Sequence, residues 1–141
     1  MSLQSTPESN SEALKSSAQK PNGSGFQRIL NATRCSILGF KAAFKHEAAF
    51  RQELLLVAIL IPIAAFISES LMGFVSLIVV LLLVLIVELL NSAVEAVVDR
   101  IGLERHELSG RAKDLGSAAV SLALLIAGLV WLAHILDFIF R

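Results

Sequence analysis

Apolar residues in this chain form long blocks instead of the spaced positions that a soluble core produces. Three blocks, residues 54–67, 71–87 and 115–136, contain no Asp, Glu, Lys or Arg. At about 1.5 Å per helical residue, the third block crosses a hydrocarbon core of roughly 30 Å and the second nearly does. The first block reaches a full span when it is extended back through residues 48–50. The pattern predicts an all-α membrane protein with three transmembrane helices.

Two segments of different composition precede these blocks. Residues 1–25 are rich in Ser, Asn, Gln, Gly and Pro, which predicts a disordered polar tail without the apolar run of a signal peptide. Residues 26–52 alternate apolar residues at helical spacing with Arg and Lys, as in an amphipathic helix on an anionic membrane surface. The expected domain division is therefore 1–25, 26–52 and 53–141.

The basic residues predict the topology, because Lys and Arg accumulate in cytoplasmic loops. Residues 26–52 and 99–114 each contain several of them, whereas the connection 67–70 contains none. The N-terminus is therefore expected in the cytoplasm and the C-terminus on the outer side.

The sequence ELLNSAVEAVVDR follows the second block directly and returns charge to the helix. With 3.6 residues per turn, its polar residues share one face: Glu88, Asn91, Ser92, Glu95 and Asp99. The topology puts Glu53, Lys113 and Asp114 at the same cytoplasmic boundary. An ion route would need polar groups through the whole membrane depth, so this cluster favours chemistry on a lipid headgroup.

The segment before the third block predicts a phosphate site. Residues 109–114 are expected just ahead of a helix whose N-terminus would attract an anion. Neither GxxxxGK[ST] nor GxGxxG occurs, so a nucleotide would be held by carboxylates, basic groups and a metal. Carboxylate and amide oxygens suit Mg²⁺ that bridges phosphates.

Overall composition excludes several other functions. The formal net charge is zero, and basic patches interleaved with aromatic residues are absent, so nucleic-acid binding is not expected. The single cysteine, Cys35, excludes an intrachain disulfide, and the three histidines lack the paired spacing of a zinc site.

Three motifs carry a family resemblance: EAAFRQE (residues 47–53), VELLNSAVEAVVDRIG (residues 87–102) and HELSGRAKDLGSAAV (residues 106–120). From about residue 25 onward, the chain closely resembles the small integral-membrane diacylglycerol kinases of bacteria. The resemblance implies a lipid kinase of the bacterial inner membrane that transfers the γ-phosphate of Mg-ATP to diacylglycerol and makes phosphatidic acid. A sister branch phosphorylates undecaprenol, but HELSGRAKD favours the diacylglycerol branch.

The resemblance also implies a homotrimer with active sites shared between subunits, and it assigns roles by motif. Glu88 would be the general base, and Glu47 and Glu95 would hold the Mg²⁺ that bridges the ATP phosphates. The other residues of the nucleotide and substrate site would be Arg28, Ser36, Arg51, Glu53, Asn91, Lys113 and Asp114.

Simpler explanations exist for some of these residues. Glu47 could form an i, i+4 ion pair with Arg51 on an exposed helix, and Asp99 could belong to a solvated helix end. Glu88 and Asn91 could be a polar clamp between membrane helices. A transport or structural protein without enzymatic activity is the alternative from another functional class.

Overall fold

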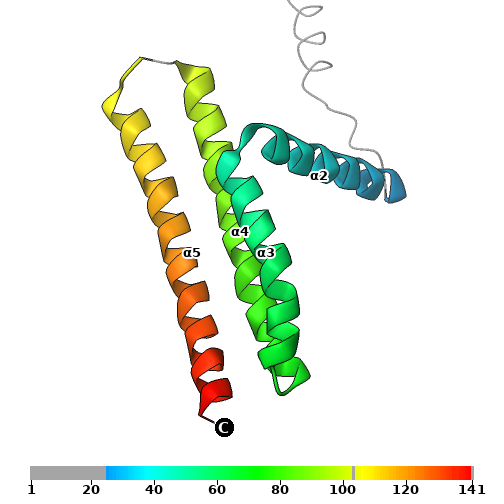
Figure 1. Cartoon of the computed structure of the whole chain (residues 1–141). Helices are drawn as coiled ribbons and strands as arrows, with labels where there is room; N and C mark the ends of the chain where they lie inside the picture. Colours follow the sequence, from blue (N-terminus) through cyan, green and yellow to red (C-terminus); the bar gives the residue numbers. More distant parts are fainter. Residues whose placement is uncertain (1–24, 103, 141) are drawn as a thin grey trace, which may run out of the picture. The chain divides into compact units, whose positions relative to one another are not determined.

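The computed structural model describes residues 25–102 and 104–140. This part of the chain contains four helices, labelled in Figure 1: α2 (Phe26–His46), α3 (Ala48–Ile67), α4 (Leu71–Ile101) and α5 (Glu107–Ile139). The chain divides into two units, one ending at Gly39 and the other beginning at Phe40. The predicted tail lies outside the described residues, apart from Gly25.

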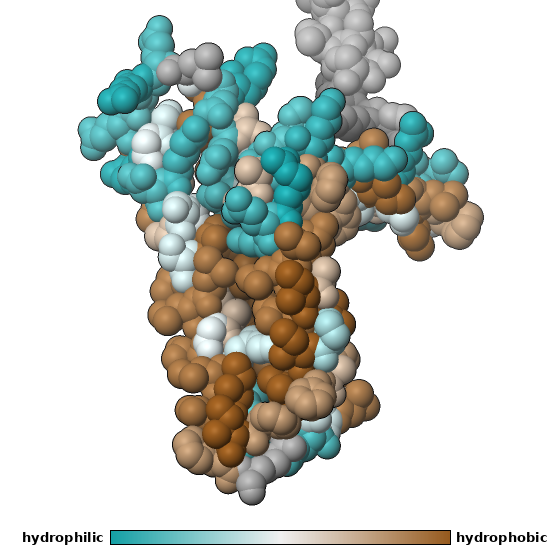
Figure 2. All heavy atoms as spheres, viewed as in Figure 1, coloured by the Kyte–Doolittle hydropathy of each residue, from teal (hydrophilic) through white to brown (hydrophobic). Residues whose placement is uncertain are grey.

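Three of these helices, α3, α4 and α5, are long and apolar enough to cross a membrane, which confirms the predicted number of spans. Helix α4 has 31 residues. At 1.5 Å per residue its length is about 46 Å, which exceeds a hydrocarbon core of roughly 30 Å by several turns. On the face seen in Figure 2, apolar side chains cover the spans, and hydrophilic side chains gather where α4 ends and α5 begins.

An interruption of the helix at Glu47 separates α2 from α3. Glu47 is extended (φ −103°, ψ 115°), so α2 ends at His46 and does not continue to residue 52. The guanidinium of Arg51 donates from Nη1 to the carbonyl oxygens of Phe44 (3.1 Å) and Lys45 (3.4 Å). These carbonyls belong to the last turn of α2, whose acceptors lack partners within the helix, and the bonds from Arg51 therefore stabilise the break.

Helix α4 packs along both α5 and α3, whereas α3 and α5 touch each other only weakly. Leu77 is fully buried within the main core cluster. The other buried members of this cluster are Val57, Ala64, Ile67, Leu81 and Trp131. Beside it, His134 on α5 approaches Ser76 on α4, with 3.3 Å between Nε2 and Oγ, and this polar contact fixes the two helices at the end remote from Glu88.

Replacing Leu77 with Ala should destabilise the helix bundle, because the cavity removes close contacts that lipid cannot restore. We expect a loss of about 2 to 5 kcal/mol in the free energy of unfolding. The measurement is the thermal unfolding midpoint in detergent, with Leu71→Ala as the matched control because Leu71 is 80% exposed. Equal losses in the two variants would contradict the role of Leu77 in the core.

Candidate active site

The polar face of α4 begins with a buried carboxylate. Glu88 is 4% exposed. Among the described residues, it is the one charged residue that is buried. One turn further along, Nδ2 of Asn91 donates to Oε1 of Glu95 at 3.0 Å, as the i, i+4 spacing on one helix face allows. The predicted face is therefore present, and the hydrogen bond holds two of its members together.

Three carboxylates lie near Glu88: those of Glu95 on α4, Glu53 on α3 and Glu47 between α2 and α3. Its carboxylate is close enough to those of Glu47 and Glu95 for electrostatic repulsion, and Glu53 on α3 is close enough to experience the charge of Glu88. No ion pair joins Glu47 to Arg51 in the described part of the chain, since Arg51 donates to backbone carbonyls instead. A cation among these acidic groups would reduce their mutual repulsion.

The beginning of α5 differs from the prediction. The helix starts at Glu107, and Nδ1 of His106 caps it by accepting from the backbone N–H of Leu108 at 3.2 Å. Glu107 in the first turn interacts favourably with the positive end of the helix dipole. Lys113 and Asp114 therefore lie inside the helix and not ahead of its N-terminus, so the predicted helix start near residue 115 was wrong, while phosphate binding by this segment stays a prediction.

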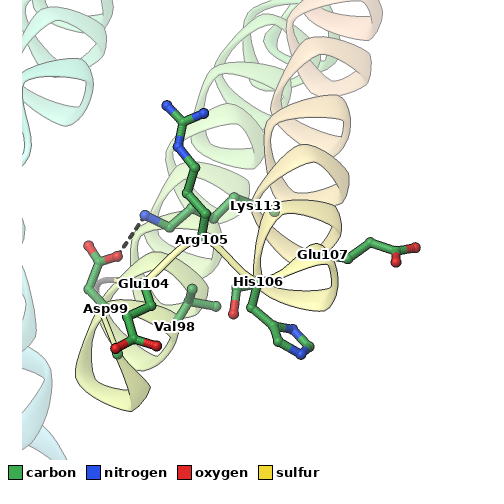
Figure 3. Close-up of a pocket in the computed structure, with 10 residues that line it drawn as sticks. Val98, Asp99, Glu104, Arg105, His106, Glu107 and Lys113 are labelled. Carbon is green, nitrogen blue, oxygen red and sulfur yellow. Dashed lines mark hydrogen bonds and ion pairs between the residues drawn. The ribbon is translucent and has the colours of Figure 1, made fainter.

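Lys113 reaches across from α5 to the last turn of α4. Its Nζ lies 2.7 Å from Oδ1 of Asp99, as the dashed line in Figure 3 shows. The electrostatic field of Glu95 also reaches Lys113. Asp99 is thus not simply a solvated helix end, and sequence reasoning missed this pairing because the two residues come from different helices.

The ion pair borders an open pocket of about 600 Å³ between the end of α4 and the start of α5. Its lining residues are Val98, Asp99, Gly102, Glu104, Arg105, His106, Glu107, Ser109, Gly110 and Lys113. In Figure 3, Lys113 points toward Asp99, while Glu107 points away from both. Arg105 and Lys113 are cations that can bind phosphate oxygens, and the carboxylates of Asp99, Glu104 and Glu107 line the same open pocket.

A second pocket, of about 260 Å³, lies within the apolar part of the bundle. All three spans line it, through residues that include Val57, Val84 and Trp131. Glu53 is the charged residue of this lining, and one of its oxygens, Oε2, is buried without a hydrogen-bond partner. The pocket therefore combines an apolar wall with one carboxyl group, which suits an amphipathic ligand.

The other predicted site residues have local contacts of a structural kind. Ser36 donates from Oγ to the carbonyl oxygen of Ala32 at 3.0 Å, and Arg28 lies in the first turn of α2. Both belong to the unit that ends at Gly39, so their place in the site stays a prediction. Arg51 stabilises the break between α2 and α3, and Asp114 is exposed.

The described residues contain no group of three or more His, Cys, Asp or Glu side chains that could hold a metal ion. Two carboxylates would nevertheless suffice for Mg²⁺ that takes its other ligands from phosphate oxygens and water. Oδ1 of Asn91 and Oγ of Ser92 are buried without hydrogen-bond partners near these carboxylates. Such unpaired atoms are uncommon in native proteins, so the donor set fits a site that is completed by a ligand.

These features define a multi-pass membrane protein with an acidic site where its spans leave the apolar layer. The profile of the prokaryotic diacylglycerol kinase family matches residues 34–135, and the chain belongs to this family. The match includes every predicted site residue except Arg28.

Similar proteins support the same assignment. A diacylglycerol kinase from Haemophilus influenzae is 56% identical over 107 residues, which cover 76% of this chain and 91% of the relative. A diacylglycerol kinase from Pseudomonas aeruginosa is also 56% identical, over 76% of this chain and 87% of the relative. One from Escherichia coli is 53% identical over 110 residues, with 78% and 90% covered.

If Lys113 contributes to nucleotide binding, Asp99→Asn should lower the KM for Mg-ATP, because Lys113 loses the carboxylate that competes with phosphate. We expect a decrease of about two- to five-fold, the scale of an exposed ion pair, with little change in thermal stability. The measurement is initial rate against Mg-ATP concentration. The control, Glu104→Gln, removes one negative charge from the same pocket without releasing Lys113, and an equal decrease there would contradict the argument.

Proposed function

We propose that this chain transfers the γ-phosphate of ATP to the free hydroxyl of diacylglycerol, which gives phosphatidic acid. The observation that carries the proposal is the position of Glu88, a buried carboxylate at the end of an apolar span in a member of this family. A carboxylate there can meet an alcohol that stays in the membrane. A nucleotide can approach the same level from the water.

Glu88 acts as the general base in this proposal. It accepts the proton of the diacylglycerol hydroxyl while the hydroxyl oxygen bonds to the γ-phosphorus and the bond to the ADP oxygen breaks. Burial keeps water away from the carboxylate, so the lipid hydroxyl is the alcohol that it activates. The apolar pocket beside Glu53 is suited to hold an acyl chain near this point.

Glu47 and Glu95 would hold Mg²⁺ in this arrangement, and the ion would neutralise phosphate charge during transfer. Support comes from the repulsion that both carboxylates exert on Glu88, which a divalent cation offsets. Asn91 orients Glu95 through its hydrogen bond. Lys113 supplies positive charge beside the polyphosphate.

The remaining polar residues complete the proposed site. Asp114, Arg28, Ser36 and Arg51 belong to the surroundings of the nucleotide and the lipid headgroup. Glu53 lines the apolar pocket and is close enough to Glu88 to experience its charge.

We also infer that the working enzyme is a homotrimer. Most residues of each apolar span are not buried within the single chain, while polar atoms of Glu53, Asn91 and Ser92 are buried without partners. In lipid, unpaired polar atoms cost more than in water, so a neighbouring subunit or a substrate is expected to satisfy them. The basic, amphipathic helix α2 would lie on the cytoplasmic surface of the inner membrane.

Replacing Glu88 with Gln should lower kcat by about 10² to 10⁴-fold, because the amide cannot accept the hydroxyl proton. The measurement is transfer of labelled γ-phosphate from Mg-ATP to diacylglycerol in mixed micelles. Elution of the variant at the wild-type position on gel filtration would show that the assembly is intact. Glu69→Gln, at the opposite end of the bundle, is the charge-matched control and should keep wild-type turnover.

Two outcomes would contradict the proposal in different ways. Wild-type turnover in Glu88→Gln would remove Glu88 from the role of base. Transfer to undecaprenol and not to diacylglycerol, when both lipids are offered together, would keep the mechanism and change the substrate.

The proposed orientation predicts that the turn between α3 and α4 faces the periplasm. In a Cys35→Ala background, Glu69→Cys should react with a membrane-impermeant maleimide when spheroplasts are intact. A cysteine introduced at Glu104, near the start of α5, should react after the membrane is broken and not before. Labelling of both positions from outside would reverse the proposed topology.

A further inference from the structure

Asn91 on α4 and Gly116 on α5 face each other where the two helices pack. A Cβ atom built on Gly116 would collide with Oδ1 of Asn91, and it would lie 3.3 Å from Cγ and 3.8 Å from Cα of the same residue. The asparagine side chain therefore occupies the volume that any side chain at position 116 would need.

The other glycines of α4 and α5 do not share this constraint. A Cβ built on Gly110 or Gly128, both on α5, would meet nothing within 4 Å. At Gly73 on α4 the nearest atom would be 3.4 Å away, which is ordinary contact. Among the described glycines, Gly116 is the position where a methyl group would meet a residue of the acidic site.

The orientation of the Asn91 amide follows from its two neighbours. Nδ2 donates to Oε1 of Glu95, so Oδ1 points away from Glu95. Oδ1 is buried, it has no conventional hydrogen-bond partner, and it lies where the Cβ of a residue at position 116 would be. A glycine carries its second Hα in that direction, and a Cα–H···O contact is a weak but real attraction.

We propose that Gly116 is a positioning residue for phosphoryl transfer. Its missing side chain admits the Asn91 amide in one orientation, and that amide holds the Glu95 carboxylate toward the cation. The inference rests on the proposed function, because that function makes Glu95 a metal ligand. It adds that the geometry of the metal site depends on the spacing between α4 and α5.

A general need for small residues between helices would not explain this arrangement. Ala123 and Ala127, also on α5, are buried in contact with Val84, so α5 accepts a Cβ elsewhere along the same interface. At Gly116 even one methyl group must displace Asn91. The requirement is therefore specific to the asparagine side chain.

Gly116→Ala should lower kcat by about 10²-fold, the scale of a displacement of roughly 1 Å in a catalytic group. It should also raise the Mg²⁺ concentration for half-maximal rate, while the KM for diacylglycerol stays at the wild-type value. A merely structural defect would not change the Mg²⁺ requirement selectively. Gly39→Ala is the control, because a Cβ there would meet nothing within 4 Å, and it should keep wild-type rates.

A double variant tests whether Asn91 is the group that the methyl displaces. Gly116→Ala should lower the thermal unfolding midpoint in the wild-type background, and Asn91→Ala in the same chain should restore most of the loss. If Gly116→Ala does not fold by itself, folding of the double variant would support the proposal. An equal loss with and without the Asn91 side chain would overturn it.

The activity measurement separates failure of this inference from failure of the proposed function. A wild-type protein that phosphorylates diacylglycerol, together with a folded Gly116→Ala variant of unchanged rate and Mg²⁺ dependence, would overturn the role of Gly116 alone. A folded wild-type protein that phosphorylates no lipid alcohol would overturn both.

Discussion

The structure depends on keeping a carboxylate buried at the boundary of an apolar layer. A carboxylate placed deeper in the apolar block than Glu88 would have its charge in hydrocarbon, where a charge is costly. A carboxylate placed nearer the end of α4 would be exposed to water. Helix α4 resolves this by continuing without a break from the apolar block into the polar segment. The depth of Glu88 is therefore set by the length of the apolar block before it, and Asn91 and Glu95 follow at fixed rises along the same rigid helix.

Several polar atoms near the level of Glu88 are buried without hydrogen-bond partners. A soluble protein can leave a polar atom near the surface because water will bind it, but the hydrocarbon layer offers no such partner. Glu53, Asn91 and Ser92 each keep a buried oxygen without a partner. In the proposed function, these oxygens lie where phosphate, a cation and the lipid hydroxyl would supply partners.

The sequence allowed the spans and the polar face of α4 to be predicted, because both depend on periodicity within one helix. Contacts between helices could not be predicted in this way. The pairing of Asp99 with Lys113 and the contact of Asn91 with Gly116 depend on the register of α4 against α5, which no local pattern encodes. The break at Glu47 was also missed, because Arg51 stabilises it from the following helix.

The register of α4 and α5 is itself fixed at several levels. Ser76 meets His134 at one end, and Asp99 meets Lys113 at the other, while Asn91 rests on Gly116 between these two contacts. A slip of one helical turn, about 5.4 Å, would break all three contacts together. Each contact is individually modest, but because they share one register, the position of Glu95 against α5 is determined by interactions along the whole length of the helix pair. The geometry of the acidic site is therefore coupled to packing at the far end of the same two helices.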